Sequence, residues 1–97
     1  MRHYEMLTIL SAEMEEPREE VGKIEEVVRD LGGTIARTDV WGKRALAYPI
    51  QKKTEGFYAL YEFDLAPEQT FELRRILGLR ANVYRQMIIL LDDQPSP

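Results

Sequence analysis

The chain has 97 residues, of which 44% are hydrophobic and 31% are charged, and its formal net charge is −4. This length corresponds to one domain, and the composition is that of an ordinary soluble globular protein. The absence of cysteine excludes a disulfide framework and a thiolate metal site. No apolar run approaches the roughly 18–20 residues needed to cross a membrane, and the amino terminus lacks a signal-peptide pattern, so we expect a cytoplasmic protein.

The first third of the chain predicts a strand followed by a helix. Residues 2–10 alternate in character, and both rows of the alternation are mostly apolar, which indicates a central strand. Pro17 stands near the first turn of the helix, where several carboxylates favour the positive end of the helix dipole. Gly32 and Gly33 are placed to end this helix. Its buried stripe at helical spacing consists of Val21, Ile24, Val28 and Leu31.

The middle of the chain predicts two strands joined by a turn. An extended segment runs from about Thr34 to Ile50, and QKKTEG at residues 51–56 makes the turn. FYALYEFDL at residues 57–65 is the clearest strand in the chain. Its more apolar row consists of Phe57, Ala59, Tyr61, Phe63 and Leu65.

The last third predicts a helix and a strand. APEQ at residues 66–69 opens the helix, with Pro67 at a favoured starting position. Leu73, Ile76 and Leu77 share one face of this helix, while the aromatic ring of Phe71 falls on nearly the opposite side. VYRQMIILL at residues 83–91 is the final strand.

The order strand, helix, strand, strand, helix, strand defines an α+β fold class. Two β-α-β halves of this kind pack as a split βαβ (ferredoxin-like) sandwich, β-α-β-β-α-β, with a four-stranded antiparallel sheet and both helices on one face. We therefore expect a single ferredoxin-like domain over residues 1–91 and a flexible acidic C-terminal tail over residues 92–97. The first and third strands should be central in the sheet, and the second and fourth should form its edges.

The stretch VWGKRALAYPIQKK, residues 40–53, contains four of the thirteen Lys and Arg residues of the chain. Pro49 cannot donate a ladder hydrogen bond, so it favours an edge strand, and Gly42 in mid-strand indicates a bulge. Lys43 and Arg44 also discourage pairing with another sheet edge. A protected edge strand explains these features, but it leaves the continuing positive charge at Lys52 and Lys53 unexplained.

Charge is distributed unevenly along the chain. Residues 1–33 carry four Lys/Arg against nine Asp/Glu, a balance of −5. Residues 34–58 carry five against two, a balance of +3, and residues 59–97 carry four against six, a balance of −2. The overall acidity argues against nucleic-acid binding, whereas the positive central segment favours it.

Catalysis has little support in this sequence. His3 is the only histidine, no cysteine is available as a nucleophile, and Ser11 and Ser96 show no accompanying base and orienting acid. The carboxylates between Glu13 and Glu26 match no calcium-loop spacing. We therefore predict no enzyme activity, no metal and no cofactor. The alternative is a homodimeric ligand-binding or small oxygenase-type α+β domain of similar topology, which requires an enclosed apolar pocket.

Binding to RNA has more support, because basic side chains near strand ends and the central hairpin are mixed with aromatic rings. Ammonium and guanidinium groups contact phosphates, and exposed rings stack on unpaired bases. The rings in question are Tyr4, Trp41, Tyr48 and Tyr84. An RNA-recognition-motif domain has the same element order, but EGFYALYE at residues 55–62 places Ala59 and Glu62 where that motif needs aromatic residues.

Four segments resemble the bacterial small-subunit ribosomal protein family numbered six in that subunit's series. They are MRHYE at the start, WGKRALAYPI with basic residues just after it, GFYALYEF after the turn, and LRANVYRQMI near the end. Together they span almost the whole chain in the expected order, and WGKRALAYPI is the most specific of them.

The resemblance implies a non-catalytic constituent of the ribosome, without a small-molecule substrate or a membrane partner. Family members pair with the ribosomal protein numbered eighteen as a heterodimer and bind the central domain of small-subunit ribosomal RNA during assembly. RNA contacts are expected at Arg2, Lys43, Arg44, Tyr48, Lys52 and Lys53, and less directly at Arg80, Asn82 and Arg85. An open sheet edge suits a partner protein, with contacts expected at Trp41, Leu46, Tyr48 and Ile50.

Overall fold

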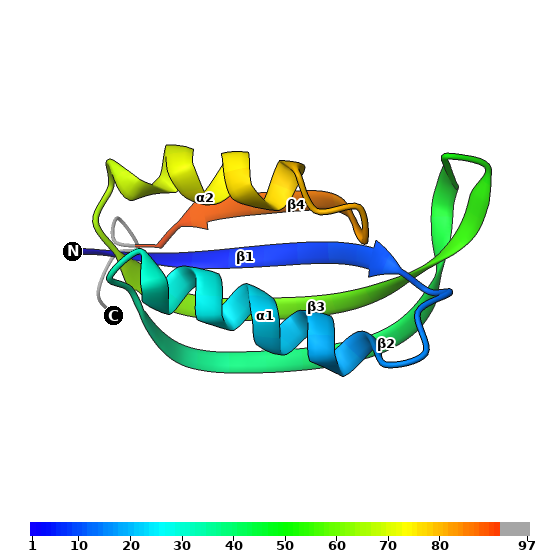
Figure 1. Cartoon of the computed structure of the whole chain (residues 1–97), viewed down its shortest axis with the longest axis horizontal. Coiled ribbons are helices and arrows are strands. Elements are labelled where there is room, and N and C mark those ends of the chain that lie inside the picture. The colour runs from blue at the N-terminus through cyan, green and yellow to red at the C-terminus, as the bar shows by residue number, and fades with distance from the viewer. Residues whose placement is uncertain (92–97) are drawn as a thin grey trace.

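The four strands form one antiparallel sheet in the order β2-β3-β1-β4, and both helices cover the same face of it (Figure 1). This architecture comes from a computed structural model that describes residues 1–91. The predicted split βαβ fold is therefore confirmed, with the first and third strands in the centre. The predicted tail, residues 92–97, lies outside the described residues. The elements are β1 (Arg2–Ser11), α1 (Pro17–Asp30), β2 (Thr34–Ile50), β3 (Lys53–Leu65), α2 (Gln69–Gly78) and β4 (Val83–Leu90).

The core lies between the sheet and the two helices. One row of β1, with Met6 and Leu10 fully buried, faces the helices, and the apolar row predicted for β3 is buried beside it. The predicted stripe of α1 covers these rows through Val21, Ile24 and Val28, while Leu31 packs at the margin. Leu73 and Leu77 of α2 complete the core, and Phe71 lies exposed on the far side of that helix. The period of the side chains, two residues in a strand and about 3.6 in a helix, thus determines which apolar residues face the core.

The end of α1 brings the chain very close to β3. Gly32 has a φ of 91°, and its N–H donates to the Arg29 carbonyl, while the Gly33 N–H donates to the Val28 carbonyl, each at 2.9 Å. This confirms the predicted glycine cap. A Cβ atom at Gly33 would lie 2.7 Å from the carbonyl oxygen of Asp64, whereas one at Gly22, inside α1, would meet nothing within 4 Å.

Two glycine substitutions test this packing in opposite directions. Gly22→Ala should stabilise the protein by about 1 kcal/mol, because alanine is the better helix former and has free space there. Gly33→Ala should destabilise it by about 2 kcal/mol, because the added methyl group overlaps a backbone oxygen that cannot move independently. Urea unfolding measures both free energies. Equal changes at the two positions would contradict the packing described here.

Two predicted boundaries were wrong. The helix α2 begins at Gln69 rather than at Pro67, because the Gln69 and Thr70 N–H groups donate to the carbonyls of Ala66 and Pro67 in a preceding turn. The turn between β2 and β3 contains only Gln51 and Lys52, and β3 begins at Lys53 instead of Phe57. Pairing with β2 extends β3 through its polar first residues, which single-strand periodicity does not predict.

A pair of hydroxyl groups lies inside the core. The Tyr61 hydroxyl and the Thr8 Oγ1 atom are 3.0 Å apart, and both residues are inaccessible to solvent. Burial raises the pKa of the Tyr61 hydroxyl well above its usual range. In the folded protein Tyr61 therefore stays protonated at pH values where a tyrosine of the unfolded chain ionises.

This difference predicts a loss of stability at high pH. The contribution of Tyr61 to the free energy of unfolding is fully present below about pH 10, the ordinary tyrosine pKa. It declines above that pH because only the unfolded state releases the hydroxyl proton there. Tyr61→Phe should cost about 1 kcal/mol at neutral pH through the lost hydrogen bond. From pH 8 to 11, however, the wild type should lose about 1 kcal/mol more than the variant. Urea unfolding at both pH values tests this, and a difference that does not change with pH contradicts it.

Candidate nucleic-acid interface

The strands β2 and β3 continue past the rest of the sheet as a hairpin. The ladder between β1 and β3 ends at Ser11 and Gly56, so β3 residues before Gly56 have no β1 neighbour. We call residues 43–55 the hairpin arm. Figure 1 shows this arm, in green, curving away beyond the end of β1. Because it has few neighbours, the arm presents its side chains to solvent from both strands.

The backbone of the arm departs from a regular ladder in the ways its sequence predicts. The register shifts between Val40 and Gly42, and Gly42 has a φ of 88°, which confirms the predicted bulge. Regular pairing stops at Ala45 and resumes only where Ile50 pairs with Lys53, so Pro49 needs no ladder hydrogen bond. The loop residues Gln51 and Lys52 have φ values of 50° and 67°, as two-residue hairpin turns of the primed types require.

Contacts with aromatic rings hold the arm in place. The Arg85 guanidinium of β4 lies 5.2 Å from the ring centroid of Tyr48, a cation–π contact that joins the arm to the opposite edge of the sheet. The Arg44 guanidinium lies 5.7 Å from the Trp41 ring, which stacks on Tyr58 at 6.2 Å. These contacts bring Arg44, Tyr48 and Arg85, three of the predicted RNA-binding residues, to one end of the molecule.

The three lysines predicted to bind RNA also lie around one hollow, from the start of the arm at Lys43 to its turn at Lys52. Lys43, Lys52 and Lys53 line one hollow together with Tyr84 of β4. The Lys53 Nζ atom lies 2.8 Å from Glu13 Oε1, and this hydrogen bond raises the pKa of the Lys53 ammonium group. The arm and its base therefore concentrate positive charge in a protein that is acidic overall.

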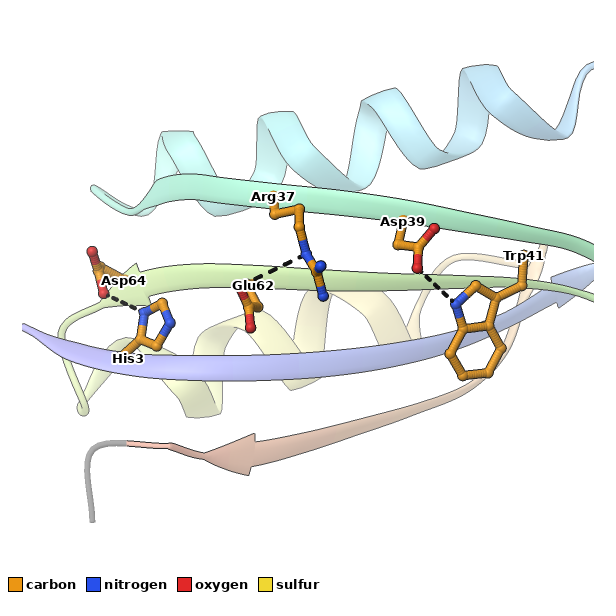
Figure 2. A network of polar contacts seen from close by, with 6 residues as sticks. All are labelled: His3, Arg37, Asp39, Trp41, Glu62 and Asp64. Atoms are coloured by element: carbon orange, nitrogen blue, oxygen red, sulfur yellow. Dashed lines mark hydrogen bonds and ion pairs between the residues drawn. The ribbon is translucent and has the colours of Figure 1, made fainter. Parts of the chain in front are cut away.

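The face of the sheet opposite the helices is open. Leu7 of β1 pairs with Leu60 on one side and Met87 on the other, and the Met87 side chain is 54% exposed. Figure 2 shows polar contacts on the same face, and the Trp41 Nε1–H donates to Asp39 Oδ2 at 3.2 Å there. Contiguous exposed apolar surface with a polar border is typical of a protein-binding site.

The border of this open face includes a hydrogen bond between His3 and Asp64 and an ion pair between Arg37 and Glu62, each crossing between strands (Figure 2). His3 Nδ1 of β1 lies 2.8 Å from Asp64 Oδ1 of β3, and Arg37 Nε of β2 lies 3.9 Å from Glu62 Oε2. Both pairs are partly exposed. They contribute little to stability at the surface, but they orient charged groups around the apolar centre.

The remaining predicted contact residues lie elsewhere or are already engaged. Arg2 is at the far end of β1, away from the arm. The Arg80 guanidinium holds the Glu20 carboxylate of α1 with two hydrogen bonds, 2.5 Å from Nε to Oε2 and 3.0 Å from Nη2 to Oε1. Asn82 accepts the Ser11 N–H through its carbonyl at 2.9 Å, and its side chain is exposed beside the acidic start of α1. The aromatic ring expected at Tyr4 is buried and stacks on Phe63, so its predicted exposure was wrong.

The buried carboxylate of Glu20 is a structural feature that the sequence analysis missed. Its side chain is only 6% exposed, and the hydrogen bond to it raises the pKa of the Arg80 guanidinium. The sequence does indicate this burial, because Glu20 stands four residues before Ile24 and eight before Val28, on the same face of α1 as the buried stripe. The pair joins α1 to the segment that precedes β4, sixty residues later in the chain.

Breaking this pair should destabilise the fold. Arg80→Leu leaves the Glu20 carboxylate buried and uncompensated, which should cost about 3 kcal/mol in urea unfolding. The double variant Glu20→Leu/Arg80→Leu should recover most of that loss, because no buried charge remains. Arg75→Leu, which breaks an exposed pair with Glu72 on α2, serves as the control and should cost less than about 0.5 kcal/mol. An equal loss at Arg75 and Arg80 would show that burial of Glu20 is not the cause.

Within residues 1–91, no cluster of three or more His, Cys, Asp or Glu side chains is arranged to hold a metal ion. Over the same residues, no helix has the length and apolarity needed to cross a membrane. The hollow beside the arm and a second one beside the start of α1 are lined mainly by charged side chains. Neither is the enclosed apolar pocket that the oxygenase-type alternative requires.

The fold and the surface thus define a class of protein: a ferredoxin-like α+β domain with a cationic hairpin arm and an open apolar sheet face.

Comparison with known proteins identifies the family within this class. The family model described as "Ribosomal protein S6" matches residues 3–90. A small ribosomal subunit protein bS6 from Caldanaerobacter subterraneus is 40% identical over 95 residues, covering 96% of this chain and 100% of the relative. Another, from Paenarthrobacter aurescens, is 44% identical over 96 residues, covering 97% of this chain and 95% of the relative. The crystal structure of 30S ribosomal protein S6 from Thermotoga maritima shares the fold with a TM-score of 0.86 at 24% identity, covering 95% of this chain and 89% of that one.

The chain belongs to the ribosomal protein S6 family. It is accordingly a component of the small ribosomal subunit, found on the ribosome in the cytoplasm, and it is not an enzyme. The resemblance noted in its sequence is confirmed, and the enzyme alternative is excluded.

Proposed function

We propose that the protein binds the central domain of small-subunit ribosomal RNA together with the ribosomal protein numbered eighteen, as a heterodimer. The observation that carries this proposal is the hairpin arm, which gathers Lys43, Arg44, Lys52 and Lys53 with the exposed Tyr48 ring beyond the end of the sheet. Lysine and arginine contact phosphate groups without reading sequence, and an exposed ring stacks on an unpaired base. Arg85 supports the arm through Tyr48 and adds a further positive charge.

The partner protein has a second surface in this proposal, which adjoins the RNA-binding arm and shares Tyr48 with it. The outer edge of β2 offers backbone hydrogen-bonding groups, and Trp41, Leu46, Tyr48 and Ile50 place apolar side chains along it. The open sheet face continues that surface through Leu60 and Met87. The carboxylates of Glu62 and Asp64 at the border of the open face attract a basic partner.

The acidic net charge is compatible with this function, because phosphate binding depends on the local field. Charges more than about 8–10 Å from a phosphate are largely screened at physiological salt. The carboxylates of α1 lie on the helix face of the sheet, whereas the arm extends past its end. RNA docked on the arm therefore meets a positive surface, and a second protein supplies the rest of the interface.

Removal of two arm cations tests the assignment. In the complex with the partner protein, Lys43→Ala/Arg44→Ala should weaken binding to a central-domain RNA fragment by about tenfold and lower the salt slope of log K by one to two. The exposed α1 pair Lys23→Ala/Arg29→Ala removes the same charge away from the arm and should leave the affinity within about twofold. Fluorescence titrations across a salt series measure both.

Stability should fall by about 1 kcal/mol or less in either double variant, since all four charges are exposed and the exposed cation–π contact of Arg44 contributes only about 0.5–1 kcal/mol. Circular dichroism and urea unfolding provide this control. Equal RNA affinities of the arm variant and the wild type across the salt series would remove Lys43 and Arg44 from the RNA-binding surface.

A further inference from the structure

The hollow beside the hairpin arm has the size and chemistry of a ligand site. It has a volume of 350 Å³, near the lower end of the roughly 300–1,000 Å³ typical of small-ligand sites. The arm contributes Lys43, Lys52, Lys53 and Glu55, the loop after β1 contributes Glu13, and β4 contributes Tyr84. Most small-ligand pockets are apolar, but charged groups dominate this one, so its ligand is an ion or carries one.

The charges around the hollow favour a singly charged anion. Lys53 is paired with Glu13 at 2.8 Å, and the two charges offset one another. Within residues 1–91, neither Lys43 nor Lys52 forms an ion pair, and both side chains are exposed to solvent. Three ammonium groups against the carboxylates of Glu13 and Glu55 leave an excess of one positive charge. A phosphodiester, which carries one negative charge per nucleotide, matches that excess.

The hollow also has one aromatic wall. Tyr84 is partly exposed and lines the hollow from β4, on the other side of β1 from the arm. A nucleobase stacks on such a ring whatever its identity, because every base has a π face. The phosphate-binding lysines and the stacking ring thus come from different elements but line the same space.

The walls of the hollow are held in position before any ligand arrives. The Tyr48–Arg85 contact ties the arm to β4, the strand that supplies Tyr84. The backbone at Lys52 is fixed in the two-residue turn, where its φ is 67°. A site assembled in advance loses less conformational entropy on binding than one that must be ordered by its ligand.

We propose that this hollow binds one unpaired nucleotide of RNA, with Lys43 and Lys52 on its phosphodiester and Tyr84 stacked on its base. The inference rests on the proposed function and adds to it that the bound RNA has an unstacked nucleotide at this point. Glu13 limits the affinity, because its carboxylate occupies Lys53, the third cation of the site.

The experiment uses the full chain in complex with the partner protein and a central-domain fragment of small-subunit ribosomal RNA. Tyr84→Leu should weaken binding at least fivefold through lost stacking. Glu13→Gln should strengthen binding about threefold or more and increase the salt slope by about one, because Lys53 becomes available to phosphate. Lys23→Gln, on the exposed face of α1, is the control and should change the affinity less than twofold.

A double variant and a crosslinking experiment on the wild-type complex complete the test. Lys52→Gln and Tyr84→Leu should weaken binding together by less than the product of their single effects, because both contact the same nucleotide. Short-wave ultraviolet crosslinking of the wild-type complex, which needs no variant to fold, should join RNA to the peptide that contains Tyr84.

The outcomes separate this inference from the proposed function. A wild-type complex that fails to bind the fragment overturns both. If the wild-type complex binds the RNA, three results together overturn the nucleotide site alone. They are an affinity of Tyr84→Leu within twofold of the wild type, no gain in affinity for Glu13→Gln, and crosslinks that fall outside the peptide containing Tyr84. Urea unfolding of each variant shows whether a loss of binding reflects a loss of folded protein.

Discussion

The length mismatch between β1 and the β2–β3 hairpin is the constraint on which the rest of this structure depends. β1 pairs with β3 over all ten of its residues and with β4 over residues 4–10, whereas β2 has 17 residues and β3 has 13. Because the core needs only the part of the hairpin that lies beside β1, the remainder extends past the sheet as an arm. Backbone pairing within the hairpin keeps that arm ordered where no helix covers it.

The same constraint separates structural from binding residues. Side chains of β1 and β3 that face the helices are buried, so their chemistry serves the core, as the Thr8–Tyr61 pair illustrates. Beyond the end of β1, positive charge has no desolvation penalty to overcome, because both strands of the arm remain in contact with water. This explains how a protein with a net charge of −4 keeps a cationic extension without destabilising its fold.

Carboxylates of the first helix region have three different roles, and their positions alone decide which. Glu20 is buried and binds Arg80, so it links two distant parts of the chain. Glu13 lies in the loop after β1 and engages Lys53 of the arm, while Glu19 faces solvent near the start of α1. The identical side chain thus acts in the core, at the ligand hollow and on the surface, according to what packs against it.

Periodicity in the sequence was sufficient to predict the element order, the fold class and most of the core. The usual arrangement of that fold then predicted the central and edge strands, and a glycine in mid-strand predicted the bulge at Gly42. Periodicity failed at Pro67 and at the start of β3, where hydrogen bonds in a turn and pairing with another strand set the boundaries. Tyr4 shows a second kind of failure, because a ring on an alternating strand fits the core and the surface equally well until the helices are placed.

The sequence by itself determined which face of both helices and of β3 is apolar, because that property depends only on neighbours a few residues apart. It also carried the family, since segments from the start to the end of the chain match in order. Only the tertiary structure decided that Tyr84 lines the same hollow as Lys43 and Lys52, and that Arg85 meets Tyr48. Such contacts join residues more than thirty positions apart, and they exist only once the strands have paired in their final order.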